Sequence, residues 1–323
     1  MVPLFGRDGM VCQIMEDASM LEPTLLVDLP LVTGEGPLWH PKEQCIYWLD
    51  IPPGLIFRYT PATGKTETFE AGAAVGGATL QADGKLLLFM ADGAIRLWSD
   101  GRLTGTVIER LAEERGNRFN DVIADPKGRV FCGTMSTAER PGRLYRLDLD
   151  GTIHQLLDGI GTSNGLGFTP DRKGIYYTDT RRHAIYHFDY DAESGAITQQ
   201  RTWVHVQNTA VEGRPDGLTV DAAGFVWSAR WDGGCAVRYD PAGNEVDRIE
   251  FPCRKVTSMT FGGPAYRDLF ITTAGGDDRN ANGSHAGALF HVRPPVPGVP
   301  EFRSRIGLAG FRTLPSQSPI PAC

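Results

Sequence analysis

The sequence predicts an all-β protein, a six-bladed β-propeller of four-stranded antiparallel blades. Six segments repeat one plan, in which a polar or small residue precedes a short apolar run, a turn and a second β-rich run. The segments begin at Glu35, Gly77, Asn120, Asn164, Asp216 and Ser258, at intervals of 42, 43, 44, 52 and 42 residues. A period of about 40–50 residues with several strands in each unit is typical of propeller blades.

The turns and the later strands of each unit support the same prediction. The turn comes five residues after the starting residue, as at His40-Pro41 and Asp125-Pro126, and aromatic or β-branched runs such as CIYWLD and GIYYTD follow it. Further runs such as LIFRYT and GRLYRLD alternate polar and apolar residues, as half-buried strands do. The alternative is a β-sandwich with coincidental spacing, which six units in phase disfavour.

The ends of the chain complete the predicted architecture. Residues 24–32 (TLLVDLPLV) precede the first unit, and we expect them to form a strand that pairs with the last blade. Such closure removes the exposed edge strands that favour aggregation. We therefore expect an N-terminal extension over 1–23, a single propeller domain over 24–310 and a C-terminal tail over 311–323. The long fourth interval places extra length around 191–213, for which a lid is one role.

Composition excludes several classes of function. The net charge is −7 without a basic run, which argues against nucleic acid as a partner. No stretch approaches the roughly 18 apolar residues of a membrane helix, and the N-terminus lacks the features of a secretory signal. The six cysteines form no CxxC pair, so we expect reduced thiols and a cytoplasmic protein. We expect a monomer or a weak homo-oligomer.

The starting residues of the six units indicate where a functional site lies. By symmetry they form a ring around the propeller axis, and five of the six carry a side-chain oxygen. Two carboxylates brought close together repel unless a cation compensates them. Carboxylate and amide oxygens suit hard divalent ions. The ring therefore favours a metal site, although a solvated polar channel without an ion has the same composition.

Neighbouring positions add candidate ligand-binding groups. Arg118 lies two residues before Asn120, in NRFND, where its guanidinium could hold a polar substrate; a surface salt bridge is the alternative. The seven histidines show no paired metal-ligand spacing, and the sequence contains no nucleophile elbow or Walker loop. The Gly/Asn/Asp-rich stretch 275–287 is expected to be a flexible loop over the channel mouth.

Five motifs in order resemble the SMP-30/gluconolactonase/regucalcin family. They are GEGPLWHP, NRFNDVIADPKGRVFCGTM, TSNGLGFTPD, RPDGLTVDAAGFVWSARWDGG and AGALFHV, and they run from about Glu35 to about Val292. The resemblance implies a six-bladed propeller that hydrolyses sugar lactones with one bound divalent metal ion. The metal could be Ca²⁺, Mn²⁺, Zn²⁺, Mg²⁺ or Fe²⁺.

The resemblance also implies roles for particular residues. Glu35 of GEGP, Asn164 of SNG and Asp216 of PDG are expected to bind the metal, with Asp216 also the general acid/base. Arg118 and Asn120 of RFND are expected to contact substrate. Some family members carry a substrate-binding glutamate three residues after GTM. Here that position is Ala138, and Glu139, one residue further, is the substitute candidate.

A mechanism follows from these roles as a hypothesis. The metal would polarise the lactone carbonyl, and Asp216 would take a proton from the attacking water and later pass one to the ring oxygen. Hydrolysis of another ester on the same metal is one alternative. The other is a non-enzymatic propeller that binds metal or a protein partner.

Overall fold

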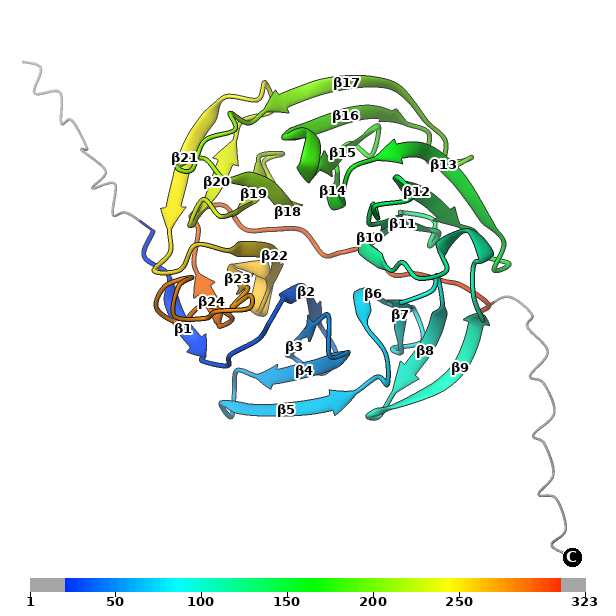
Figure 1. The fold of residues 1–323 in the computed structure, drawn as a ribbon, viewed down its shortest axis with the longest axis horizontal. Helices are drawn as coiled ribbons and strands as arrows, with labels where there is room; N and C mark the ends of the chain where they lie inside the picture. Colours follow the sequence, from blue (N-terminus) through cyan, green and yellow to red (C-terminus); the bar gives the residue numbers. More distant parts are fainter. Residues whose placement is uncertain (1–20, 309–323) are drawn as a thin grey trace, which may run out of the picture.

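The structure is a computed structural model that describes residues 21–308. Six four-stranded antiparallel sheets surround a common axis, which confirms the predicted fold class (Figure 1). Residues 1–20 and 309–323 lie outside the described residues. These ranges include most of the predicted N-terminal extension, the C-terminal tail, Cys12 and Cys323.

The strands of each blade follow one another from the axis outward. The first blade contains β2 (Gly34–His40), β3 (Cys45–Asp50), β4 (Leu55–Thr60) and β5 (Lys65–Glu70). The second contains β6 (Val75–Leu80), β7 (Leu86–Met90), β8 (Ile95–Ser99) and β9 (Arg102–Ile108). The third contains β10 (Phe119–Ala124), β11 (Val130–Thr134), β12 (Gly142–Leu147) and β13 (Ile153–Ile160).

The remaining blades repeat this order. The fourth contains β14 (Ser163–Phe168), β15 (Gly174–Asp179), β16 (Ala184–Tyr190) and β17 (Ile197–His205). The fifth contains β18 (Arg214–Val220), β19 (Val226–Trp231), β20 (Cys235–Tyr239) and β21 (Glu245–Glu250). The sixth contains β22 (Val256–Gly262), β23 (Asp268–Thr273), β24 (Leu289–Val292) and β1 (Thr24–Val27). Three short 3-10 helices are η1 (Ala112–Glu114), η2 (Thr180–Arg182) and η3 (Pro264–Tyr266).

The N-terminal strand closes the ring as predicted, but it is shorter than 24–32. β1 pairs antiparallel with β24, and the strand ends at Val27. Pro30 has no N–H to donate to a ladder. Beyond it, the backbone N–H groups of Val32 and Thr33 donate to the Asp50 carboxylate at 3.1 and 2.8 Å. These bonds turn the chain inward to begin the first blade.

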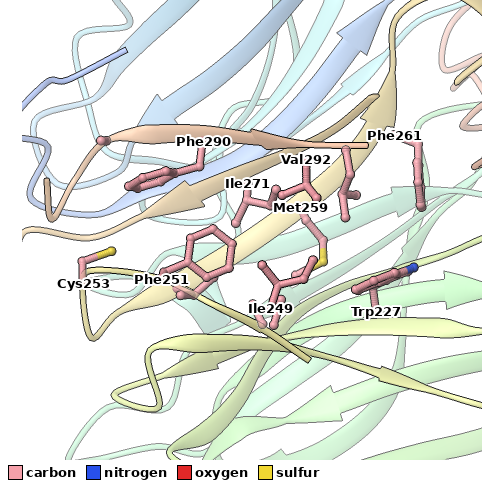
Figure 2. Close-up of a cluster of buried hydrophobic side chains, with 14 of the residues drawn as sticks. Trp227, Ile249, Phe251, Cys253, Met259, Phe261, Ile271, Phe290 and Val292 are labelled. Carbon is pink, nitrogen blue, oxygen red and sulfur yellow. The ribbon is translucent and has the colours of Figure 1, made fainter. Parts of the chain in front are cut away.

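Hydrophobic side chains fill the space between adjacent blades. Figure 2 shows one such cluster, in which Trp227 and Ile249 of the fifth blade pack against Met259, Ile271 and Phe290 of the sixth. Each of these five side chains is at most 3% exposed. Burying a side chain of this size stabilises the fold by about 1.5–3 kcal/mol. Because such clusters join neighbouring blades, the strand ends around the axis are held in fixed positions.

The innermost strands share an irregularity at the starting residue of each repeat. In all six the pairing register shifts at or beside that residue, so that β2, β6, β10, β14, β18 and β22 each carry a bulge there. A bulge bends the strand and redirects a side chain. Glycine follows the starting residue where innermost strands approach closely. A Cβ on Gly165 would lie 2.7 Å from the Asp216 carbonyl oxygen.

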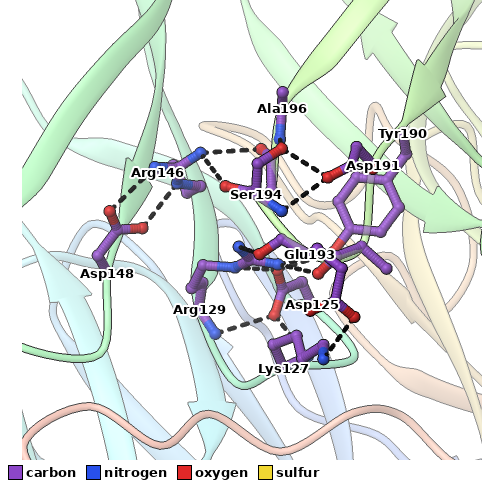
Figure 3. Close-up of polar contacts among 12 residues, drawn as sticks. Asp125, Lys127, Arg129, Arg146, Asp148, Tyr190, Asp191, Glu193, Ser194 and Ala196 are labelled. Atoms are coloured by element: carbon purple, nitrogen blue, oxygen red, sulfur yellow. Dashed lines mark hydrogen bonds and ion pairs between the residues drawn. The ribbon is translucent and has the colours of Figure 1, made fainter.

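The extra length around 191–213 joins two blades. The turn between β16 and β17 lies against the third blade (Figure 3). Arg129 donates to the carbonyl oxygens of Ala192 (2.6 Å) and Glu193 (2.9 Å), and Arg146 donates to those of Ser194 (2.9 Å) and Gly195 (3.0 Å). Both guanidiniums also contact carboxylates, Arg129 with Asp125 and Arg146 with Asp148. These contacts attach the turn, which is part of the extra segment 191–213, to the third blade.

A segment after the last strand crosses the end of the propeller at which the innermost strands finish. This C-terminal strap, residues 293–308, runs behind the centre of the ring in Figure 1. Ala222 N–H donates to the Pro297 carbonyl and Gly298 N–H to the Tyr266 carbonyl, so the strap begins on the fifth and sixth blades. Arg305 N–H then donates to the Gly128 carbonyl and Gly307 N–H to the Leu149 carbonyl, both in the third blade. The strap therefore ties opposite sides of the ring together.

We expect Gln81→Leu to lower the free energy of unfolding by about 2–4 kcal/mol, because the buried amide makes two hydrogen bonds to the strap. Gln81 Nε2 donates to the Ile306 carbonyl, and Oε1 accepts from the Ile306 N–H, both at 3.0 Å. Denaturant unfolding measures the change. Gln155→Leu, on the exposed face of β13, is the matched control. Equal stability of the two variants would show that the strap is not needed for stability.

The structure also bears on the predictions about cysteines and membrane helices. Cys45, Cys132, Cys235 and Cys253 are buried free thiols, as expected of reduced cysteines. Within residues 21–308 no helix has the length and apolar character needed to cross a membrane.

Candidate active site

A polar cavity of ≈ 320 Å³ lies at the end of the axis where the innermost strands begin. Five residues predicted as site residues line it: Glu35, Arg118, Asn120, Asn164 and Asp216. They come from the first, third, fourth and fifth blades. The ring inferred from the repeat therefore brings these residues together in space.

The other two ring positions lie deeper. Gly77 and Ser258 line a second cavity along the axis, which Asp121 also lines. The strap closes this channel at the opposite end with Glu301 and Phe302. Four of the six ring residues thus face the outer cavity, and the other two face the channel below it.

The two ring carboxylates are buried, and neither forms an ion pair within the described residues. Glu35 and Asp216 are each 3% exposed. Glu35 Oε2 accepts the Gly36 N–H at 2.9 Å, and the Asp216 carboxylate accepts no hydrogen bond from the described residues. Burial raises the pKa of both carboxyls well above the usual range. Repulsion adds to the shift of the pKa, from Asp121 in both cases and from Asp216 in the case of Glu35. Arg118 opposes the shift at both carboxyls, and Arg214 opposes it at Asp216.

Asp121 and Arg118 extend this electrostatic cluster. Burial raises the pKa of Asp121 to about 7, an effect that the Arg118 guanidinium partly opposes. Burial also lowers the pKa of Arg118, while Glu35, Asp121 and Asp216 act in the other direction. Three carboxyl groups and one guanidinium thus share a desolvated space, and their protonation states depend on one another.

A chain of hydrogen bonds fixes the amide side chains of the site. Arg118 Nη1 donates to Asn120 Oδ1 at 2.6 Å, and Asn120 Nδ2 donates to Asn164 Oδ1 at 2.7 Å. Asn164 Nδ2 donates to Thr180 Oγ1 at 2.8 Å, and the Thr180 hydroxyl donates to the Pro215 carbonyl at 2.7 Å. The chain crosses from the third blade to the fifth and ends beside Asp216. Each amide is therefore held in one orientation.

This donor set fits a hard divalent ion. Two buried carboxylates that form no ion pair with the protein favour a compensating cation, and an amide oxygen beside them is a neutral ligand of the kind that Ca²⁺ and Mg²⁺ accept. The described residues contain no group of three or more His, Cys, Asp or Glu placed to hold a metal. A bound ion would therefore take an amide as its third side-chain ligand, and Glu35, Asn164 and Asp216 would be its ligands.

Glu139 and the two long loops do not contribute to the cavity. Glu139 is exposed in the turn after β11, where its backbone N–H donates to Thr137 Oγ1, and it is absent from the cavity lining. No residue of 191–213 or 275–287 lines the cavity either. Within 275–287, Arg279 and His285 pair with Asp28, before the first blade.

The cavity also contains residues that the ring does not predict. Ile51, Met135, Arg181 and Trp231 line it, each at the end of the second strand of a blade. Ile51, Met135 and Trp231 follow the ring residue of their own blade by 15 or 16 residues. Comparing the six units at the position 15 or 16 residues after each starting residue would have identified these three cavity residues.

The fold and the cavity together define a six-bladed propeller protein with a polar, ligand-sized pocket at one end of its axis. Residues 33–275 match the family model described as SMP-30/Gluconolactonase/LRE-like region. The chain belongs to this family.

Individual relatives cover nearly the whole propeller. The chain is 46% identical over 294 residues to "Pentonolactonase XacC" of Haloferax volcanii, covering 88% of this chain and 99% of that protein. It is 33% identical over 281 residues to "6-deoxy-6-sulfogluconolactonase" of Pseudomonas putida, covering 85% and 96%. Among solved structures, a calcium-binding regucalcin from Agrobacterium tumefaciens superposes with a TM-score of 0.81 at 28% identity, covering 88% of this chain and 98% of that one.

Proposed function

We propose that this protein is a metal-dependent hydrolase that opens sugar lactones to aldonic acids. The observation that carries the proposal is the pair of buried carboxylates, Glu35 and Asp216, which form no ion pair with the described residues and lie in a ligand-sized cavity beside an ordered amide. Two of the relatives are named as lactonases, and they match over almost their full length.

The cavity suits a hydroxyl-rich substrate. Three arginines line it, Arg118, Arg181 and Arg214, together with Thr33, Thr162 and Thr180. Guanidinium and hydroxyl groups supply many hydrogen bonds to sugar oxygens. Because the relative at 46% identity is named as a pentonolactonase, five-carbon aldonolactones are the first substrates to test.

In this proposal the reaction is an ordinary ester hydrolysis carried out by the residues of the cavity. A divalent ion held by Glu35, Asn164 and Asp216 would polarise the lactone carbonyl. Asp216 accepts a proton from a water molecule whose oxygen forms a bond to the carbonyl carbon. When the bond between that carbon and the ring oxygen breaks, Asp216 returns the proton to the ring oxygen. Arg118, held by Asn120 at 2.6 Å, orients the lactone by donating to its oxygens.

Hydrolysis of an aldonolactone panel tests the proposal. Metal-stripped protein is assayed for proton release with and without Ca²⁺, Mn²⁺, Zn²⁺, Mg²⁺ or Fe²⁺, against the spontaneous rate of each lactone. We expect hydrolysis that depends on the added metal and is fastest with pentonolactones. Absence of any enhancement in folded, metal-loaded protein would contradict the proposal and leave another ester or a binding role.

A further inference from the structure

Arg181 is the cavity arginine whose side chain has no partner among residues 21–308. The two other arginines of the cavity are held in place. Arg118 donates to Asn120 and to the Phe119 carbonyl, at 2.6 and 2.9 Å. Arg214 forms an ion pair with Asp232 at 2.7 Å. Arg181 is an exposed residue of the cavity lining and makes no side-chain hydrogen bond or ion pair to the described protein, so its donors remain available to a ligand.

The backbone at Arg181 is nevertheless placed precisely relative to the candidate metal ligands. Arg181 follows Thr180 in η2, and the Thr180 hydroxyl connects Asn164 with the Pro215 carbonyl through bonds of 2.8 and 2.7 Å. The base of the side chain rests on Gly161, where a Cβ would lie 2.6 Å from Arg181 Cβ. A side chain at position 161 would displace Arg181. The backbone and Cβ of Arg181 are thus fixed beside the candidate metal ligands.

We propose that Arg181 is a specificity-determining residue that donates hydrogen bonds to the ring hydroxyls of an aldonolactone. This inference rests on the proposed lactonase function. The family resemblance assigns substrate recognition to a glutamate in the turn after β11, but here that turn contributes neither Ala138 nor Glu139 to the cavity. Arg181 supplies hydrogen-bond donors to the cavity from the next blade. In this protein a guanidinium that donates hydrogen bonds to the substrate thus replaces a carboxylate that accepts them.

Kinetics with two lactones of matched ring size test this role. D-Xylono-1,4-lactone carries ring hydroxyls and γ-butyrolactone has none. We expect Arg181→Gln to raise KM for the xylonolactone by about 10–100-fold, the loss typical of a charged hydrogen bond, with kcat changed less. The same variant should change kcat/KM for γ-butyrolactone by less than about 3-fold. Arg181→Lys should recover part of the KM, because one cationic donor remains.

Arg182→Gln is the control within the same 3-10 helix. Arg182 is absent from the cavity lining, pairs with Asp179 at 3.4 Å and donates to the Gly159 carbonyl at 2.7 Å, so both lactones should react as with the wild type. Equal losses for both lactones in Arg181→Gln would assign Arg181 a structural role and overturn the proposal. Faster hydrolysis by the wild type of a lactone with a terminal carboxylate, lost in Arg181→Gln, would also overturn it, in favour of an anion subsite.

A binding measurement separates this inference from the proposed function. Calorimetry compares xylonate with 4-hydroxybutyrate on metal-loaded protein, and no turnover is required. We expect xylonate to bind the wild type more tightly, and Arg181→Gln to remove that difference. If the wild type hydrolyses no lactone but discriminates between these acids through Arg181, the function fails and the recognition role stands. If lactones are hydrolysed and the variant discriminates like the wild type, the recognition role fails alone.

Discussion

Asp216→Asn is expected to lower kcat/KM for the best lactone by at least about 10³-fold while leaving the fold intact. A positioned general base contributes about 10²–10⁴-fold, and this carboxylate is also a candidate metal ligand. Asparagine keeps the shape of the side chain but cannot accept the proton. The Asp216 carboxylate makes no hydrogen bond to the described residues, so little packing or pairing is lost. Initial rates at saturating metal, with circular dichroism of the same samples, measure the two effects.

The metal content of the variant separates the two roles of Asp216. If the variant loses activity but keeps the ion, the Asp216 carboxylate acts in proton transfer. If the variant loses both the activity and the ion, the carboxylate is needed as a metal ligand. Asp240→Asn is the matched control, because Asp240 lies in an exposed turn and bonds only to Ala242 and Asn244. Near-normal turnover by Asp216→Asn with its ion bound would remove Asp216 from the mechanism.

The repeat predicts the fold well for a physical reason. Each blade must bury its two faces against its neighbours, so the same apolar pattern recurs wherever a blade begins. The position of the turn after residues such as Glu35 and Asn164 then fixes the phase of each unit. Because the blades are arranged symmetrically, residues at equivalent positions of the units lie around the axis. The structure places five predicted site residues in the lining of one cavity.

Features that have no counterpart in the other blades could not be predicted from the repeat. The strap has no counterpart in any blade, and its bonds to Gln81 and Gly128 join segments more than 170 residues apart. Arg181 lies in a short 3-10 helix after its strand, where the other blades place a single apolar residue such as Ile51 or Met135. The distance from a motif predicts Glu139 as a substrate-binding residue, whereas Glu139 is exposed in that turn.

Metal binding is expected to raise the thermal stability of the protein, and Glu35→Gln to abolish this effect. An ion that binds only the folded state adds about 4 kcal/mol when its concentration is 1,000 times the dissociation constant. The metal-free protein keeps Glu35, Asp121 and Asp216 close together in a desolvated site. Differential scanning calorimetry of stripped and loaded protein measures the gain. Equal melting temperatures with and without every metal would contradict the ion site.

The same carboxyls give the metal-free protein a distinctive dependence on pH. In the unfolded chain these groups titrate near pH 4. Burial raises the folded pKa of Asp121 to about 7, and burial with repulsion between carboxyls raises those of Glu35 and Asp216 well above their usual range. Above pH 4 the folded state therefore holds protons that the unfolded chain has released, and stability falls as the pH rises toward 7 and beyond.

Glu35→Gln removes one of the repelling charges, so the metal-free variant should be more stable than the metal-free wild type at pH 7.5 and should lose less stability between pH 5 and 7.5. Glu67→Gln is the control, because Glu67 lies on the outer strand β5 and pairs with Arg58 and Lys65 far from the axis. A metal-free wild type whose stability rises across this pH range would show that the three carboxyls are compensated by the protein itself. In that case the strongest physical argument for an ion between Glu35 and Asp216 would be lost.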